Sequence, residues 1–163
     1  MFFYKLNCHI SCAMKKIYLK MFYRKPIKIG SHTQWRRNFI ILPFKGAKIS
    51  IGSDCFFNND CSITAINSIF IGNGTIFGEN VRIYDHNHKF KDLDKSIKEQ
   101  GYCIGEVKIG NHCWIGSNVT ILKGTVIGDN CVIGAGCVIS GEVPNNTIVK
   151  FAKNSLIFEE LRK

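Results

Sequence analysis

Isoleucine recurs at every sixth position over a long stretch of the chain. The run comprises Ile109, Ile115, Ile121, Ile127, Ile133 and Ile139. A small residue follows each of them four places later, namely Cys113, Val119, Thr125, Cys131, Cys137 and Val143. An α-helix has about 3.6 residues per turn and would spread a six-residue period around its surface. The period instead predicts short flat strands joined by tight turns, with the isoleucine and the small residue pointing inward.

The same period appears upstream, which extends the predicted domain. It runs through Ile51, Phe57, Ile63 and Ile69, and then shifts by two residues to Ile71, Phe77 and Ile83. Three hexapeptides would close one triangular coil, and coils would stack at roughly the inter-strand spacing of 4.8 Å. We expect Gly, Asn and Asp after the isoleucines to supply turn residues with φ > 0. The sequence therefore predicts an all-β, parallel β-helical domain over residues 46–145.

Five of the eight cysteines stand at the small inward position of this repeat. They are Cys55, Cys61, Cys113, Cys131 and Cys137. We expect these thiols to be packing residues and the chain to contain no disulfides.

The net charge of +10 is concentrated near the N-terminus. Residues 1–53 contain eleven Lys or Arg and no Asp or Glu. Apolar residues recur there at helical spacing, at Phe3, Leu6, Ile10, Ala13 or Met14, Ile17 and Met21, with lysines between them. We expect a basic N-terminal arm over residues 1–45, helical or extended. Two interpretations stay open, packing on its own oligomer and adhesion to an anionic membrane surface. No recognition motif for nucleic acid accompanies the charge.

No apolar run approaches the length of a membrane span, and polar residues interrupt any secretory h-region at Lys5, Asn7 and His9. We therefore expect a cytoplasmic protein, which the arm could place at the inner face of the membrane. Residues 146–163 are expected to form a C-terminal tail with a short helix in NSLIFEELRK.

The period is lost between Ile83 and Val107, where the polar segment 85–106 begins DHNHKFKDL. A long excursion from a regular solenoid usually carries function. This one contains His86 and His88, two of the five histidines. Imidazole, with an unperturbed pKa of about 6.5, is well suited to general-base catalysis near neutral pH.

Three motifs resemble those of the hexapeptide-repeat acyltransferases: IYDHNHKF, VKIGNHCWIGSNVTILKGTVIGDNCVIGAGCVIS and EVPNN. The likeness covers roughly residues 46 to 148 and is greatest to galactoside and maltose acetyltransferases and to O-acetyltransferases of surface polysaccharides. It implies a left-handed parallel β-helix, a homotrimer, acetyl-CoA as co-substrate and no metal. It also implies direct acetyl transfer to a saccharide hydroxyl, with a histidine as general base and backbone N–H groups that stabilise the oxyanion.

The resemblance also assigns site residues. An alignment without gaps from Ile71 places His88 on the general base of galactoside-type enzymes, and NHKF resembles the Asn-His-Arg-Met of xenobiotic acetyltransferases. His86 is then expected to orient the loop or contact the acceptor, and which of the two histidines is the base stays open. The expected acceptor contacts are Asn59, Asp85 and Trp114. The expected acetyl-CoA contacts are Trp114, Ser117, Gly134, Ala135, Gly136, Ser140, Lys150 and Lys153.

Two departures from the family pattern concern the substrates. The segment KFAKNS has no Gly-Asn-Pro turn near the adenine end of CoA, and the basic arm differs from the acidic acceptor-binding segment of galactoside-type enzymes. A free small sugar is therefore a less favoured acceptor than a polysaccharide or its precursor. Alternatives are N-acetylation of an amino-sugar nucleotide and a zinc site of the γ-carbonic anhydrase type. The spacings of His86, His88 and His112 fit that zinc site poorly. An inactive scaffold would have no reason to keep the histidine-bearing excursion.

Overall fold

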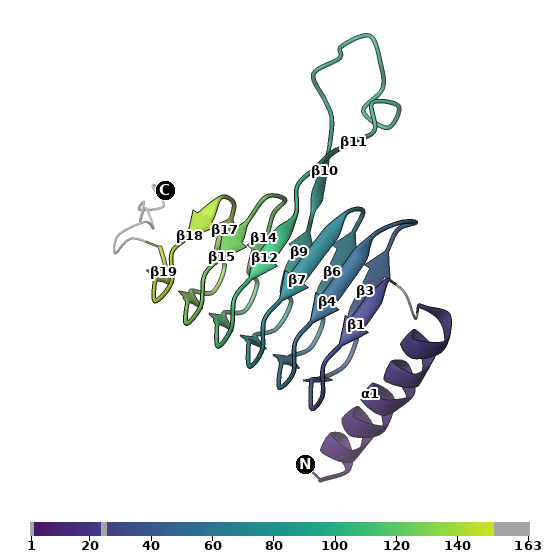
Figure 1. The fold of residues 1–163 in the computed structure, drawn as a ribbon, viewed down its shortest axis with the longest axis vertical. Helices are drawn as coiled ribbons and strands as arrows, with labels where there is room; N and C mark the ends of the chain where they lie inside the picture. The colour runs from purple at the N-terminus through teal and green to yellow at the C-terminus, as the bar shows by residue number, and fades with distance from the viewer. Residues whose placement is uncertain (1, 24–25, 152–163) are drawn as a thin grey trace, which may run out of the picture.

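The computed structural model describes residues 2–23 and 26–151. Three parallel sheets form the faces of a triangular prism, a left-handed parallel β-helix (Figure 1). Face A contains β1 (Ile27–Ile29), β4 (Lys48–Ile51), β7 (Ser68–Ile71), β12 (Val107–Ile109), β15 (Val126–Ile127) and β18 (Glu142–Val143). Face B contains β2 (Gln34–Trp35), β5 (Phe56–Phe57), β8 (Ile76–Phe77), β13 (Trp114–Ile115), β16 (Val132–Ile133) and β19 (Ile148–Val149). Face C contains β3 (Ile40–Pro43), β6 (Ser62–Ala65), β9 (Arg82–Tyr84), β14 (Thr120–Ile121) and β17 (Val138–Ile139).

The chain visits faces A, B and C in turn, so each coil crosses the prism edges AB, BC and CA. Equivalent residues of successive coils pair directly, as Ile71, Ile109 and Ile127 do on face A. These isoleucines are buried, and so are the repeat isoleucines on the other two faces. The six-residue period is therefore confirmed as one strand and one turn per hexapeptide.

The small inward residues also tie one coil to the next by hydrogen bonds. Thr75 Oγ1 donates to the carbonyl of Gly110 at 2.9 Å, and Cys113 Sγ to that of Gly128 at 3.1 Å. The five cysteines expected inside are buried, which confirms their packing role. Burial raises the pKa of the Cys61 thiol to about 11.

The glycines that follow the repeat isoleucines serve a purpose other than the one expected. A Cβ on Gly110 would lie 2.5 Å from Asp129 Oδ1 and 2.6 Å from the backbone of Gly128 in the next coil. Gly110 is therefore required for close approach between coils, and positive φ occurs two residues later, at His112 (54°). The expectation that these glycines supply φ > 0 was wrong for this position, although turn residues such as Asn130 (56°) do.

The solenoid extends beyond the predicted limits of 46–145 at both ends. It begins at β1, inside the segment assigned to the arm, and continues to β19. The first coil keeps the six-residue spacing at Ile29, Trp35 and Ile41, but its residue types differ, because Trp35 and Phe39 fill inward positions that hold Phe57 and Cys61 one coil later. Their rings stack through Phe39 on Phe57, with centroids 4.5 Å apart. A terminal coil has no further coil to match, so it accommodates bulkier side chains.

Helix α1 (Phe2–Phe22) closes this end of the prism (Figure 1). Its buried side chains Cys12 and Leu19 join the core, and Lys15 Nζ donates to the carbonyl of Phe39. The helical part of the arm is thereby confirmed. A second stripe on the helix is exposed and apolar, and consists of Ile10, Met14, Ile17 and Met21. We call these four residues the outer stripe.

No helix in the described ranges is long and apolar enough to cross a membrane. The predicted C-terminal helix in 154–163 lies outside the described residues.

Candidate active site

The excursion leaves the prism at edge CA, between β9 and β12, and starts with a short hairpin. Strands β10 (His86–His88) and β11 (Tyr102–Ile104) pair antiparallel, with His88 opposite Tyr102 (Figure 1). Alternate residues of a strand face the same side, so the two histidines lie on one face of β10 and Asn87 on the other. Both imidazoles contact the Tyr102 ring, at centroid distances of 5.3 Å for His86 and 4.6 Å for His88.

Asp85 is fully buried beneath this hairpin and holds it to the preceding coil. Its carboxylate accepts hydrogen bonds from the backbone N–H groups of Ile66 (2.9 Å) and Asn67 (2.7 Å). Those residues form the turn after β6, which is two residues longer than a regular hexapeptide turn. The two-residue shift of the repeat in the sequence thus corresponds to the longer turn that binds the Asp85 carboxylate.

The same carboxylate fixes the orientation of His86. Its Oδ1 lies 2.9 Å from His86 Nδ1. A carboxylate that already receives backbone N–H groups acts as an acceptor here, so Nδ1 carries the proton and Nε2 keeps its lone pair. Within the described part of the chain, Nε2 makes no hydrogen bond. The imidazole is 13% exposed and packs edge-on near the rings of Phe44 and Tyr84.

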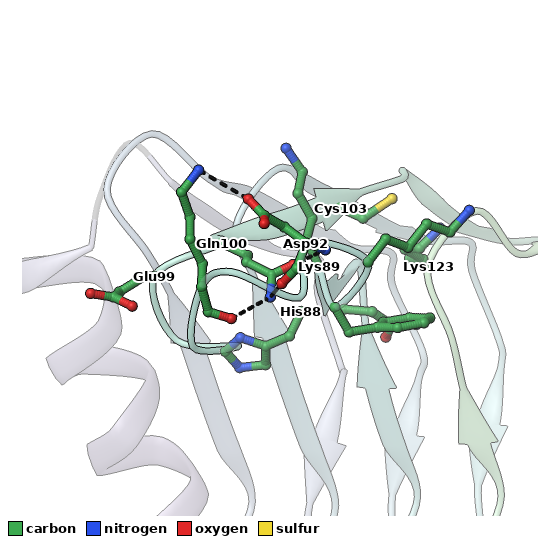
Figure 2. A pocket seen from close by; sticks show the side chains of 11 residues that line it. His88, Lys89, Asp92, Glu99, Gln100, Cys103 and Lys123 are labelled. Atoms are coloured by element: carbon green, nitrogen blue, oxygen red, sulfur yellow. Dashed lines mark hydrogen bonds and ion pairs between the residues drawn. The ribbon is translucent and has the colours of Figure 1, made fainter.

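His88 has a different environment. It is exposed and lines a cleft of about 700 Å³ enclosed by the excursion (Figure 2). The two histidines therefore differ in kind, because His86 is held by a buried acid and His88 faces an open cleft. The residues immediately around His86 and His88 do not distinguish the two imidazoles. The sequence signals that could have done so are Asp85 and the two extra residues in the turn that contains Ile66 and Asn67.

The residues expected to bind acetyl-CoA are divided between edges of the prism. Ser117, Gly134, Ala135 and Gly136 stack at edge BC, where Gly136 N donates to the carbonyl of Ser117 at 2.8 Å. Lys150 is exposed, and its Cβ lies 3.3 Å from a Cβ built on Gly134, at the same edge.

Other expected contacts lie elsewhere. Ser140 follows β17 at edge CA and is not brought together with Ala135 within one chain. Trp114 is 55% exposed on face B, between Ile76 and Val132. Lys153 lies outside the described residues.

Asn59, the expected acceptor contact, is also at edge BC and not beside the histidines. Its Nδ2 donates to Glu79 Oε1 at 3.1 Å, and its Oδ1 accepts from Arg37 N at 3.3 Å. Within one chain, edge CA thus holds Asp85 and the two histidines, and edge BC holds the donor-type turn. Face C separates the two groups.

Within residues 2–23 and 26–151, no group of three or more His, Cys, Asp or Glu side chains could hold a metal ion.

Comparison with known proteins identifies the repeat. Residues 106–141 match the family model described as "Bacterial transferase hexapeptide (six repeats)". An Escherichia coli K12 protein named for O-acetyl transfer in lipopolysaccharide biosynthesis, WbbJ, is 38% identical over 99 residues, which is 56% of this chain and 50% of that protein.

Solved structures show the same likeness. A maltose O-acetyltransferase from Clostridium difficile 630 is 34% identical, with a TM-score of 0.63, over 77% of this chain and 65% of that one. A galactoside acetyltransferase in complex with coenzyme A is 26% identical, with a TM-score of 0.56, over 69% of this chain and 60% of that one. The chain spans about half the length of curated relatives that it matches.

Proposed function

We propose that this chain, a hexapeptide-repeat protein of the bacterial transferase type, transfers an acetyl group from acetyl-CoA to a saccharide hydroxyl. The observation that carries the proposal is the buried Asp85 carboxylate holding Nδ1 of His86 at 2.9 Å. This contact leaves Nε2 as a fixed proton acceptor at the base of an accessible loop. Similarity to O-acetyltransferases supports acyl transfer as the reaction for which that acceptor is used.

The reaction follows from these groups. Nε2 of the base removes the hydroxyl proton as the acceptor oxygen attacks the thioester carbonyl, and backbone N–H groups stabilise the tetrahedral oxyanion. The C–S bond then breaks, and the imidazolium returns its proton to the departing thiolate. The products are an O-acetylated saccharide and free CoA.

We assign the base to His86, whereas alignment of the sequence favours His88. The reason is orientation: His86 has a buried carboxylate partner and a nearly enclosed ring, and His88 is exposed and lacks a carboxylate partner in the described residues. His88 is then placed to contact the acceptor in the adjoining cleft. The sequence-based assignment of His88 stays a prediction, and the two assignments are compared experimentally below.

The donor is proposed to lie along edge BC, where Gly134, Ala135 and Gly136 present bare backbone beside Ser117 and Lys150. Because edge BC and the histidines are separated by face C, one chain does not form a complete site. We therefore propose that the base of one protomer faces the donor edge of its neighbour in a homotrimer, as the resemblance implies.

Face B supports self-association. Its outward positions form an apolar ladder, in which Phe56, Ile76, Trp114, Val132 and Ile148 pair in sequence across five strands. Ile76, Trp114 and Ile148 are 45%, 55% and 66% exposed. A ladder of this kind is typical of a surface that is covered by another protomer.

The proposed acceptor class is a bacterial surface polysaccharide or its precursor, supported by the printed name of the WbbJ relative. N-acetylation of an amino-sugar nucleotide is the second candidate, because a positioned histidine also serves an amine acceptor. Incubating the purified protein with acetyl-CoA and a panel of hydroxyl and amine acceptors separates the two. Thiol release with a product 42 Da heavier in mass (about one acetyl group) supports acyl transfer. If none of the acceptors in the panel causes thiol release, the proposal of acyl transfer is contradicted.

A peripheral membrane contact through α1 is part of the proposal. The outer stripe is apolar, its four residues are 49–71% exposed, and the first 53 residues carry eleven basic and no acidic side chains. This combination favours an anionic lipid surface over a neutral one. It would place the enzyme at the inner face of the membrane, where membrane-bound glycan precursors would be within reach.

A further inference from the structure

The cleft beside His88 has an unusual balance of charge. Two carboxylates in its wall are already engaged within the loop. Asp92 Oδ2 forms an ion pair with Lys95 Nζ at 3.0 Å. Glu99 Oε2 accepts from Ser96 Oγ at 2.6 Å, which lowers the pKa of Glu99 and keeps it ionised at neutral pH.

Three further lysines in the wall have no such partner. Lys89, Lys91 and Lys123 line the cleft, and their side-chain ammonium groups make no hydrogen bond or ion pair with any described residue. Lys89 follows β10, Lys91 begins the loop, and Lys123 comes from the turn after β14, in the next coil. In the view of Figure 2, Lys89 lies between His88 and Lys123. Separate segments thus bring three lysines to the wall of one cleft. Of the two acids in the same wall, Asp92 is paired with Lys95, and Glu99 is hydrogen-bonded to Ser96 but has no basic partner among the described residues.

We propose that this cleft binds a phosphate or diphosphate group attached to the acceptor saccharide. Lysine ammonium groups are effective phosphate binders, and a cleft focuses their potential. His86 and His88 face the same side of β10, about 7 Å apart along the strand. A sugar whose phosphate occupies the lysine cleft would therefore extend toward the imidazole of His86. This inference rests on the proposed function, because the phosphate is taken to belong to the saccharide that accepts the acetyl group.

The site is tested first without acyl transfer. Binding of inorganic pyrophosphate and of glucose 1-phosphate is measured by calorimetry against glucose and glucuronate as neutral and carboxylate controls. We expect the two phosphates to bind and the controls not to. Each of Lys89→Gln, Lys91→Gln and Lys123→Gln should weaken pyrophosphate binding about threefold to tenfold. Lys98→Gln is the matched control, because Lys98 belongs to the same excursion but does not line the cleft.

Cys103 gives a local readout of occupancy. Its side chain is exposed and lines the cleft, so pyrophosphate should slow maleimide modification of Cys103, as followed by peptide mass mapping. Protection should be lost in Lys89→Gln and kept in Lys98→Gln. Equal binding of glucuronate and pyrophosphate, or binding unaffected by the three cleft substitutions, overturns the proposal.

Activity then distinguishes the source of the phosphate. A nucleotide diphosphate sugar and a lipid diphosphate sugar are offered with acetyl-CoA, and the accepted one identifies the source. The lysine substitutions should raise the acceptor KM and leave the acetyl-CoA KM unchanged. If pyrophosphate binds and no acetyl transfer to any acceptor occurs, the phosphate site stands and the proposed reaction fails. If acetyl transfer occurs only to sugars without phosphate, the proposed reaction stands and the assignment of the cleft to an acceptor phosphate fails.

Discussion

Replacing Asp85 by asparagine tests whether the buried carboxylate sets the tautomer of His86. In the native site, Oδ2 accepts from the backbone N–H of Asn67 at 2.7 Å, and Oδ1 lies 2.9 Å from His86 Nδ1. The amide oxygen of the variant is expected to stay on the Asn67 N–H, because an NH₂ group there would face another donor. The NH₂ group then points at His86 and requires Nδ1 to accept, which moves the imidazole proton to Nε2.

A protonated Nε2 cannot remove the proton of an acceptor hydroxyl. A positioned general base contributes about 10² to 10⁴ in rate, or roughly 2.7–5.4 kcal/mol at about 1.36 kcal/mol per tenfold. We expect Asp85→Asn and His86→Ala each to lower kcat by this factor. The affinity for acetyl-CoA should not change, because the proposed donor contacts are Ser117, Gly134, Ala135, Gly136 and Lys150 at edge BC and do not include Asp85 or His86.

Asp85 also anchors a turn, so a structural effect must be separated from a catalytic one. Losing the charge on hydrogen bonds to Ile66 and Asn67 should cost about 1–3 kcal/mol of unfolding free energy. His86→Ala leaves those hydrogen bonds intact, so it should be inactive without a comparable loss of unfolding free energy. The double variant Asp85→Asn, His86→Ala should be no slower than His86→Ala alone, because both changes remove the same base.

His88→Ala is the control that decides between the two assignments. It should act mainly on the acceptor KM, since His88 lines the cleft and lacks a buried acid. If His88→Ala is the dead variant and His86→Ala retains its kcat, the reasoning from the Asp85 contact is refuted. The alignment that places His88 on the general base would then be right.

The remaining predictions concern donor binding, thiols and the helix. Ala135→Trp should abolish acetyl-CoA binding measured by calorimetry and leave the trimer mass unchanged, whereas unaltered binding moves the donor site away from edge BC. Cys103 should react with iodoacetamide in the native protein far faster than Cys61, whose pKa is raised to about 11 by burial; equal labelling in a mass map would contradict the packing. Native protein should sediment with anionic vesicles and not with zwitterionic ones, and Ile17→Glu should prevent this. Binding that survives Ile17→Glu would remove the outer stripe from the membrane contact.

The sequence predicts the solenoid well because its period is set by packing. Each isoleucine at a sixth position pairs with its equivalent in the next coil, so a change of residue type there would be felt by two neighbours. The residue types change where this condition ends. Trp35 and Phe39 face a helix on one side and a coil on the other, so the first coil keeps the spacing but not the isoleucine and small-residue pattern, and the sequence prediction places it in the arm.

The candidate site was predictable as a place but not as a set of roles. Loss of the period at Asp85 marks the excursion correctly. The spacing of His86 and His88 does not reveal a strand, because β10 is stabilised by pairing with β11. The first residue of β11, Tyr102, follows His86 by sixteen positions in the chain. The buried state of Asp85 depends on the long turn at Ile66 and Asn67. Such a contact between distant residues requires coordinates.

The division of the proposed site between edges CA and BC leads to a test of assembly. If the base of one protomer faces the donor edge of the next, His86→Ala and Ala135→Trp are each inactive alone but complement each other. Any trimer containing both kinds of chain has one interface with an intact histidine and an intact donor edge. With equal coexpression, about three quarters of trimers are mixed and each has one working site of three, so activity should recover to about one quarter of the native value. A site formed within one chain predicts no recovery, and activity that stays at the level of the single variants would show that face C does not separate the reacting groups.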